Sequence, residues 1–232
     1  DLCHIYIVHP PGGVVGGDHL VINANVHEKA STLLTTPGAS KFYRSQGEIA
    51  TQQQCLEISE QASLEYLPQE NIYFPGAQVH MQTRVNLSRN AKFIVWEIHC
   101  LGLPANNERF STGHLDLEFS VTRVQKPLLM ERLHANAERL DSPTGFRAFP
   151  ITATLVAGPA NKEILDRARE QFKDVLNNKR ELVSATLIED CLSLRYLGST
   201  SEQCRNLFVR VWKVLRPLIL QRPGLSPRIW AT

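Results

Sequence analysis

Acidic side chains inside apolar segments are the residues of this sequence most able to do chemistry. Glu97 lies in the run FIVWEIHCLG and Glu131 in PLLMERL, among side chains that belong in a protein core. A carboxylate taken out of water is costly unless it is paired, hydrated or bound to a metal ion. One explanation is that each glutamate lies on a solvated strand face or pairs with an arginine such as Arg44 or Arg132. The other is that both line a polar internal channel.

Such a channel would suit a metal ion in transit better than a tightly bound one. All eight histidines precede residue 135, but they form no HExxH motif and no dense cluster. His99 and Cys100 are neighbours, and adjacent residues of a strand point to opposite faces, so they do not share one ion. Weak contacts with carboxylates, imidazoles and backbone oxygens are enough for an ion that must leave again. Besides the two glutamates, the candidates for this lining are Asp18, Ser40, Glu65 and Glu70.

The segment HPPGGVVGGD, residues 9–18, raises the question of a phosphate-binding loop. A Walker loop needs Lys followed by Ser or Thr after its last glycine, and a dinucleotide fingerprint needs GxGxxG at the start of a helix. Here Gly17 is followed by Asp18, whose charge repels a phosphate, and then by a β-type run. The glycines and prolines instead predict a rigid turn that leads into a strand at His19.

Catalytic signatures are missing from the sequence. There is no GxSxG motif, no cysteine in a recognisable nucleophile signature and no pair of carboxylates in a glycosidase-like setting. An enzyme would have to rely on a geometry that leaves no mark in the sequence. We therefore predict no catalytic residues.

Charge and composition exclude two classes of binding partner. Lys and Arg number 25 and Asp and Glu 23, a net charge of +2, whereas nucleic-acid binding needs a strong excess of clustered cations. The charge is uneven, because residues 161–232 hold 13 basic and 8 acidic residues and the preceding 160 hold 12 and 15. The five cysteines are scattered without a CxxC pair, which is typical of the reducing cytoplasm. No apolar run approaches the roughly 20 residues that cross a bilayer, so we expect neither nucleic acid nor membrane as a partner.

Periodicity predicts a mainly β protein with two α-helices near the C-terminus. Over residues 19–158, short runs of Val, Ile, Thr, Leu and Phe alternate with polar residues and end in turn residues. This pattern is typical of an elongated sandwich or coil of strands. Helical spacing over residues 161–180 then predicts a helix with Asn161 as its N-cap and with Lys179 and Arg180 near its C-terminal end.

A second helix is predicted after the segment LGSTSEQ. Its capping box is either Ser199 with Glu202 or Thr200 with Gln203, and Pro217 should end it near the preceding residue. Four basic residues on this helix either face solvent or meet an acidic partner. They are Arg205, Arg210, Lys213 and Arg216. Between the two helices, ELVSATLIEDCLSLRYLG predicts two strands around a turn at Glu189 and Asp190.

Five motifs, in order along nearly the whole chain, resemble a known family. The sequence is similar to the urease accessory protein UreD family, called UreH in some species. The matching segments are HPPGGVVGGD (9–18), TTPGASKFYRS (35–45), LEYLPQE (64–70), LGLPANNERF (101–110) and PRIWAT (227–232). Two departures accompany the resemblance: strands that precede HPPGG in the family are missing here, and Leu103 stands where an arginine is expected after Leu-Gly.

The resemblance implies a non-enzymatic scaffold or metallochaperone component in urease maturation. Family members join UreF, and through it the GTPase UreG, in a complex that docks on apo-urease and helps deliver nickel. They are mainly β proteins with two helices and a polar internal tunnel through which nickel is thought to pass. Carried over to this sequence, the lining residues are Asp18, Ser40, Glu97 and Glu131, with nickel in transit and no tightly bound cofactor.

The same resemblance implies one domain over residues 1–232, with a β-rich body at 1–158 and a helix–strand–strand–helix portion at 159–232. An alternative function is a purely structural adaptor that holds apo-urease ready for activation and has no metal path of its own. An enzyme of unknown reaction is the third hypothesis. Turnover by the isolated protein would distinguish that third hypothesis from both scaffolds.

Overall fold

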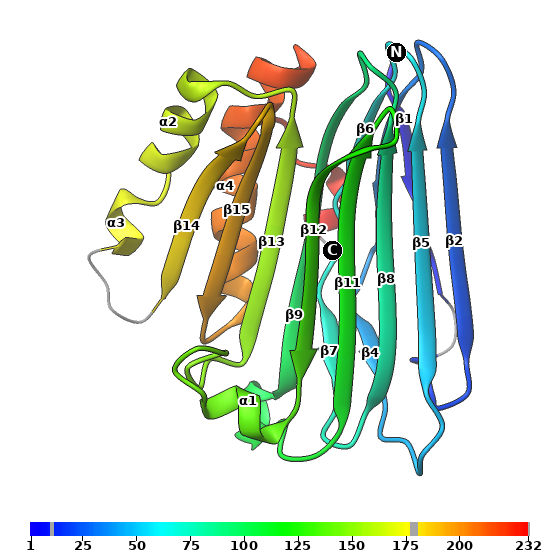
Figure 1. Ribbon diagram of the computed structural model, residues 1–232, viewed down its shortest axis with the longest axis vertical. Coiled ribbons are helices and arrows are strands. Elements are labelled where there is room, and N and C mark those ends of the chain that lie inside the picture. The colour runs from blue at the N-terminus through cyan, green and yellow to red at the C-terminus, as the bar shows by residue number, and fades with distance from the viewer. Residues whose placement is uncertain (10–11, 177–180, 232) are drawn as a thin grey trace.

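Two β-sheets stacked face to face form the body of the molecule, and helices cover part of one of them (Figure 1). The structure is a computed structural model that describes residues 1–9, 12–176 and 181–231. Sheet B has the strand order β12 (Lys126–Ala135), β11 (His114–Arg123), β8 (Gln78–Leu87), β5 (Ala50–Ile58) and β2 (His19–Val26). The main path of sheet A is β1 (Cys3–Tyr6), β3 (Ser31–Thr35), β6 (Ser63–Tyr66), β9 (Lys92–Leu103), β13 (Ile151–Gly158), β15 (Cys191–Gly198) and β14 (Leu182–Ile188). The short strands β7 (Asn71–Tyr73) and β10 (Glu108–Arg109) also pair with β9, and β4 (Ser40–Phe42) pairs with β7.

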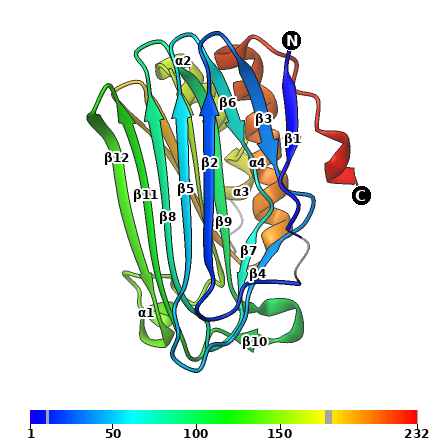
Figure 2. The same cartoon turned by 90° about the vertical axis from the view of Figure 1, so that its right-hand side faces the viewer.

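The chain winds between the two sheets as a coil. It passes from β2 to β3, from β5 to β6 and from β8 to β9, and successive strands within each sheet pair in parallel (Figure 2). The coil ends where β12 folds back antiparallel on β11 and β13 pairs antiparallel with β9. The predicted sandwich or coil of strands is confirmed.

Strict alternation along β9 separates two cores. Phe93, Val95 and Leu101 point between the sheets, whereas Ile94 and Trp96 belong to the core under the helices. The space between the sheets is itself divided into two apolar clusters, one toward each end of the strands. On the face of β9 that points between the sheets, the residues between these two clusters are polar.

Four α-helices and two short 3-10 helices are present among the described residues. The helices are α1 (Ala137–Asp141), α2 (Lys162–Glu170), α3 (Lys173–Leu176) and α4 (Ser201–Leu220), and the 3-10 turns are Pro104–Asn106 and Arg228–Ala231. Helix formation after residue 160 and after residue 200 was predicted, whereas α1 was not. None of the helices in the described ranges is long and apolar enough to span a membrane.

The first predicted helix is correct at its start and broken in its middle. Asn161 is the N-cap, because its side chain accepts a hydrogen bond from the Ile164 N–H at 3.0 Å. The helix ends at Glu170, and α3 begins after Phe172, whose buried side chain anchors the break in the core. Lys179 and Arg180 lie outside the described residues.

Helix α4 contradicts the prediction that Pro217 ends it. Thr200 caps its start by accepting from the Gln203 N–H at 3.3 Å, so the second of the two capping pairs is the one that forms. The helix then runs through Pro217 to Leu220. An interior proline costs about 3 kcal/mol, but Ile219 and Leu220 beyond it are buried, and burying such a side chain contributes about 1.5–3 kcal/mol each.

The basic residues of α4 are mostly engaged within the molecule. Arg216 is buried, Arg205 donates to Gln69 Oε1 at 2.6 Å, and Arg210 pairs with Asp174 at 3.0 Å. Lys213 is exposed. The solvated-face alternative therefore describes Arg210 and Lys213, which are exposed, whereas Arg205 and Arg216 are engaged within the molecule.

The segment that opens with HPPGG leads into β2 at His19, as predicted. Gly17 has φ +87°, a conformation that favours glycine. A Cβ on Gly16 would lie 2.4 Å from Ser45 Oγ and 2.8 Å from the Glu48 carbonyl oxygen. The glycines of this turn therefore shape the backbone and its packing. Pro10 and Pro11 lie outside the described residues.

Candidate functional site

A polar layer crosses the interior between the two apolar clusters of the sandwich. Sheet A contributes Glu97 and His99 of β9, which lie two residues apart and therefore point to the same face. Sheet B contributes Gln54 of β5 and Thr83 of β8 from the opposite side. All four side chains are buried, so the middle of the sandwich is polar where a core is normally apolar.

Glu97 is the centre of this layer. It is 5% exposed, and its Oε1 accepts hydrogen bonds from Thr83 Oγ1 and from Gln54 Nε2 at 3.3 Å. The hydroxyl of Tyr66 donates to Gln54 Oε1 and orients that amide. Among the described residues, the carboxylate is thus held by neutral hydrogen-bond donors instead of by an arginine or lysine. The proposed pairing of Glu97 with an arginine is wrong.

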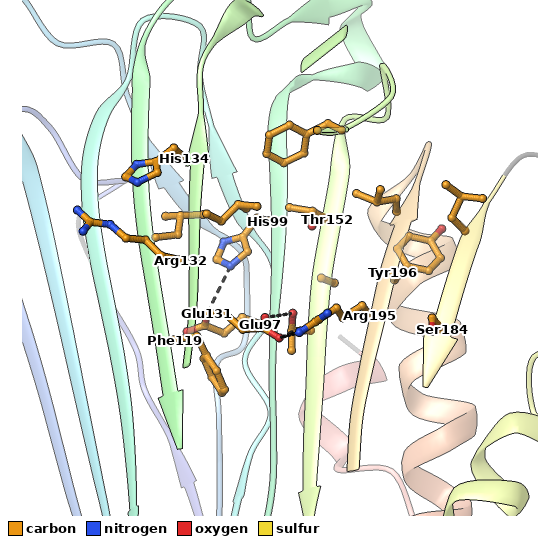
Figure 3. Close-up of a pocket in the computed structure, with 18 of the residues that line it drawn as sticks. Glu97, His99, Phe119, Glu131, Arg132, His134, Thr152, Ser184, Arg195 and Tyr196 are labelled. Carbon is orange, nitrogen blue, oxygen red and sulfur yellow. Dashed lines mark hydrogen bonds and ion pairs between the residues drawn. The ribbon is translucent and has the colours of Figure 1, made fainter. Parts of the chain in front are cut away.

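His99 continues the layer on the far side of Glu97. Its Nε2 lies 3.4 Å from Glu97 Oε2 (Figure 3). Its Nδ1 lies 2.9 Å from the Tyr73 hydroxyl. His99 is not among the site residues predicted from the sequence, because its neighbour Cys100 points to the opposite strand face and cannot share an ion with it. The spacing could have identified His99, since residues 97 and 99 point to the same face of a strand. Cys100 does point the other way, into the core beneath the helices.

Burial controls the protonation of the groups around this layer. It raises the pKa of the Tyr66 and Tyr73 hydroxyls, and the nearby charge of Glu97 raises both further. Both phenols therefore remain hydrogen-bond donors. Burial also raises the pKa of the Cys100 thiol to about 12, so it does not offer a thiolate at neutral pH.

Two cavities reach Glu97 from opposite edges of the sandwich. The larger, about 870 Å³, lies beside β12 and is lined by Glu97, His99 and Glu131 among others. The smaller, about 410 Å³, lies beside β2 and is lined by Ser40, Gln54 and Glu97. Because Glu97 lines both, it lies between the two cavities.

Glu131 lies in the wall of the larger cavity. Its side chain is 21% exposed, accepts from Arg195 Nε at 2.8 Å and lies 3.3 Å from Thr154 Oγ1 (Figure 3). The arginine pairing considered for this residue is therefore real, although the partner is Arg195 and not Arg132. Arg132 instead donates to Asp116 on the outer face of sheet B.

The four predicted lining residues divide into three that meet and one that does not. Ser40 is half-buried at the start of β4 and shares the smaller cavity with Glu97, which shares the larger cavity with Glu131. Asp18 lines neither cavity. Its carboxylate accepts from the Val15 N–H at 2.9 Å, so it stabilises the turn before β2.

Glu65 and Glu70, also considered for the lining, face the helices. Glu65 is buried against Arg216 and Trp212 of α4. Glu70 accepts from the Ser201 hydroxyl at 3.1 Å at the start of the same helix. Both acids therefore connect sheet A to α4, and their placement in a channel lining is wrong.

The donor set of the layer fits weak and successive cation contacts. Carboxylate and imidazole are ligand types that bind divalent first-row metals such as nickel. Across the described ranges, no three His, Cys, Asp or Glu side chains are close enough to hold one metal ion together. The layer therefore offers at most one or two protein ligands at a time, the Glu97 and His99 pair being the closest.

Comparison with known proteins identifies a family model and relatives to which this chain is similar. The sequence model of the family described as "UreD urease accessory protein" matches residues 1–231. A urease accessory protein UreD of Alcanivorax borkumensis is 46% identical over all of this chain, which covers 79% of that relative. Proteins of the same description are 40% identical in Citrobacter koseri, again over all of this chain and 79% of the relative, and 39% identical in Klebsiella aerogenes, over all of this chain and 83% of the relative.

Proposed function

This chain belongs to the UreD family of urease accessory proteins, and from that premise we propose that it acts in urease maturation as a non-enzymatic scaffold that helps deliver nickel. It binds UreF, and UreG through UreF, and the complex docks on apo-urease in the cytoplasm. Nickel is its cargo and not a resident cofactor. The name of the family supports the part in urease maturation, and the partners and the nickel path are the proposal.

The observation that carries the nickel path is the position of Glu97 between two cavities. A cation entering from either edge of the sandwich would reach a buried carboxylate that no lysine or arginine in the described part of the chain neutralises. Such a carboxylate attracts a cation strongly in a low-dielectric interior. Two ligands instead of four keep the affinity low enough for release, since transport through a protein requires that each site be weak enough to leave.

Each candidate residue that lines a cavity has its own role in this path. Ser40 offers a hydroxyl oxygen in the smaller cavity, Glu97 and His99 provide the central contact, and Glu131 follows in the larger cavity. Asp18 is not part of the path, because its carboxylate is used by the turn before β2.

The competing function is a structural adaptor without a metal path. It would explain Glu97 as a buried carboxylate that is merely satisfied by Thr83 and Gln54. Under that explanation, replacing the acid changes stability but leaves nickel delivery intact. The two functions therefore make opposite predictions for one variant.

The test is nickel loading of urease by complexes that contain Glu97→Gln, Glu131→Gln or both. Glutamine keeps the shape and removes the charge, so each variant should still co-purify with UreF, UreG and apo-urease, while the nickel content of urease falls. Glu118→Gln is the matched control, because Glu118 is a half-buried acid on the outer face of sheet B. Normal nickel content with the double variant would favour the adaptor, and loss with Glu118→Gln would show a general effect of charge.

A further inference from the structure

Tyr73 has one hydroxyl hydrogen and two acceptors beside it. Its hydroxyl oxygen lies 2.9 Å from His99 Nδ1 and 3.8 Å from Met81 Sδ. Burial raises the pKa of this phenol well above its ordinary value, so the hydrogen stays on the oxygen. A single hydrogen serves one acceptor at a time. A hydrogen bond from Tyr73 to His99 therefore excludes one to Met81.

The neighbours of Tyr73 hold it between these acceptors. Its ring is fully buried and stacks on Phe42 and on His99, with centroids 5.0 and 5.8 Å apart. Met81 is also buried, and its sulfur accepts from Asn71 Nδ2 at 3.8 Å, which fixes the thioether beside the hydroxyl. Rotation about the C–O bond of Tyr73 is then enough to change the acceptor, and the ring does not have to move.

The acceptor of Tyr73 determines which nitrogen of a neutral His99 carries the hydrogen. When Tyr73 donates to Nδ1, the ring hydrogen is on Nε2 and faces Glu97 Oε2 at 3.4 Å. When Nδ1 carries the hydrogen, it donates to the Tyr73 oxygen, and Tyr73 turns to Met81. Nε2 then presents a lone pair beside the Glu97 carboxylate. Only this second state can bind a cation, because a metal ion needs a bare ring nitrogen.

The spacing of Nε2 and Oε2 suits an ion that both atoms bind. Their separation of 3.4 Å is longer than the roughly 2.7–3.2 Å of an ordinary N–H···O hydrogen bond. Two ligand atoms that each lie about 2.1 Å from a tetrahedral zinc ion are roughly 3.4 Å apart. A divalent ion would therefore replace the Nε2 hydrogen with little movement of Glu97 or His99.

We propose that Tyr73 and Met81 are positioning residues that switch His99 between a hydrogen-bond donor to Glu97 and a ligand for a divalent cation. This switch rests on the proposed nickel path, because it acts on the central contact of that path. His99 is neutral in both states: solvent in the adjoining cavities takes the hydrogen from Nε2 and returns one to Nδ1. Met81 accepts the Tyr73 hydrogen that would otherwise be buried without an acceptor. Because a thioether is a weak acceptor, the metal-free protein stays in the donor state.

The test is ¹⁵N NMR of the histidine rings in the whole chain, which reports the nitrogen of each ring that carries hydrogen. Spectra are recorded at about pH 8, where a free imidazole is neutral, and His99→Gln identifies the signals of His99. The probe is Zn²⁺, a diamagnetic ion that binds carboxylate and imidazole as nickel does. Without metal, His99 should carry its hydrogen on Nε2, and saturating Zn²⁺ should place it on Nδ1.

Two substitutions separate the switch from the path. Tyr73→Phe keeps the ring but leaves the Nδ1 hydrogen of the ligand state without an acceptor, so the Zn²⁺ affinity read from the His99 signals should fall about tenfold. Met81→Leu keeps the volume and removes the sulfur, and it should lower the same affinity about threefold. The matched controls are Tyr43→Phe and Met130→Leu, which should leave the affinity unchanged. The Tyr43 hydroxyl donates to a backbone carbonyl elsewhere, and Met130 is 75% exposed.

The outcomes distinguish failure of the switch from failure of the nickel path. Hydrogen on Nδ1, or on both nitrogens, of metal-free His99 would overturn the switch. Equal Zn²⁺ affinity of Tyr73→Phe and the parent protein would do the same, and both results leave the path standing. A His99 ring that does not respond to Zn²⁺ in the parent protein would overturn the switch and also remove the central contact of the path.

Discussion

Arg216 of α4 places its guanidinium on the carboxylate of Glu65 in β6, with Nη2 and Nε 2.9 and 3.1 Å from Oε1. The side chains are 5% and 1% exposed, and Trp212 donates to the second carboxylate oxygen at 2.7 Å. The same guanidinium donates to the Pro223 carbonyl oxygen at 2.8 Å. One buried ion pair therefore ties sheet A, α4 and the segment that follows α4.

Removing one partner of this pair should be strongly destabilising. Arg216→Met leaves the Glu65 carboxylate buried without its cation, which typically costs about 3–5 kcal/mol. Urea unfolding of the variant should show this loss as a lower midpoint at unchanged slope. Arg210→Met is the matched control, because Arg210 is on the same helix and its partner Asp174 is exposed. An equal effect of both variants would contradict the assignment.

Local signals predicted the strands and helix starts of this fold, and long-range contacts account for the errors. Alternation along β8 and β11, the Asn161 cap and the turn at Glu189 depend on residues close in sequence, and all are present. The extension of α4 past Pro217 depends on a core assembled from distant segments. No local pattern could report that core.

The candidate site shows the same difference between local signals, which were predicted, and long-range contacts, which were not. Apolar surroundings were enough to mark Glu97 and Glu131 as interior acids, and the structure places both at the cavity beside β12. Their partners could not be predicted, since Thr83 is 14 residues from Glu97 and Arg195 is 64 from Glu131. Asp18 was misplaced because its carboxylate accepts a hydrogen bond from the Val15 N–H in the turn before β2, a contact that its position after the glycines did not distinguish from a channel lining.

The three tryptophans of the protein form one cluster, which gives an optical test of the C-terminal segment. Trp230 lies 5.6 Å from Trp96 and 5.5 Å from Trp212 by ring centroids, and its Nε1 donates to Thr35 Oγ1 at 3.0 Å. Trp230→Ala should uncover the two buried indoles, shift fluorescence emission to longer wavelength and cost about 2 kcal/mol, less than a fully buried tryptophan. Trp230→Phe keeps a ring in place and should shift emission little. A shift to shorter wavelength with the alanine variant would mean that the segment does not cover the other two rings.

Asp116 should make stability depend on pH in the acid range. The hydrogen bonds from Arg132 lower the pKa of Asp116 below its ordinary value of 3.8, and His134 and His80 beside it act in the same direction. A lowered folded pKa means that the stabilisation is present above about pH 4 and is lost as pH falls through the folded value. Asp116→Asn should therefore lower the urea midpoint at pH 7 and make no difference near pH 2. Carbon-detected NMR titration should find the Asp116 pKa raised in Arg132→Met, and an unchanged pKa would contradict the assigned cause.

A double-mutant cycle tests whether the polar layer is kept for function at a cost to stability. Thr83→Val removes a donor from the buried Glu97 carboxylate and should cost about 1–3 kcal/mol. Combined with Glu97→Leu, the same change should cost much less, because apolar replacement of both partners of a buried polar pair is often close to neutral. The coupling measured by urea unfolding should therefore exceed about 1 kcal/mol. If the double variant is as stable as the parent and yet delivers no nickel to urease, the acid is retained for transport. A double variant that loses more stability than Thr83→Val alone would instead make Glu97 a structural residue and remove the central support of the nickel path.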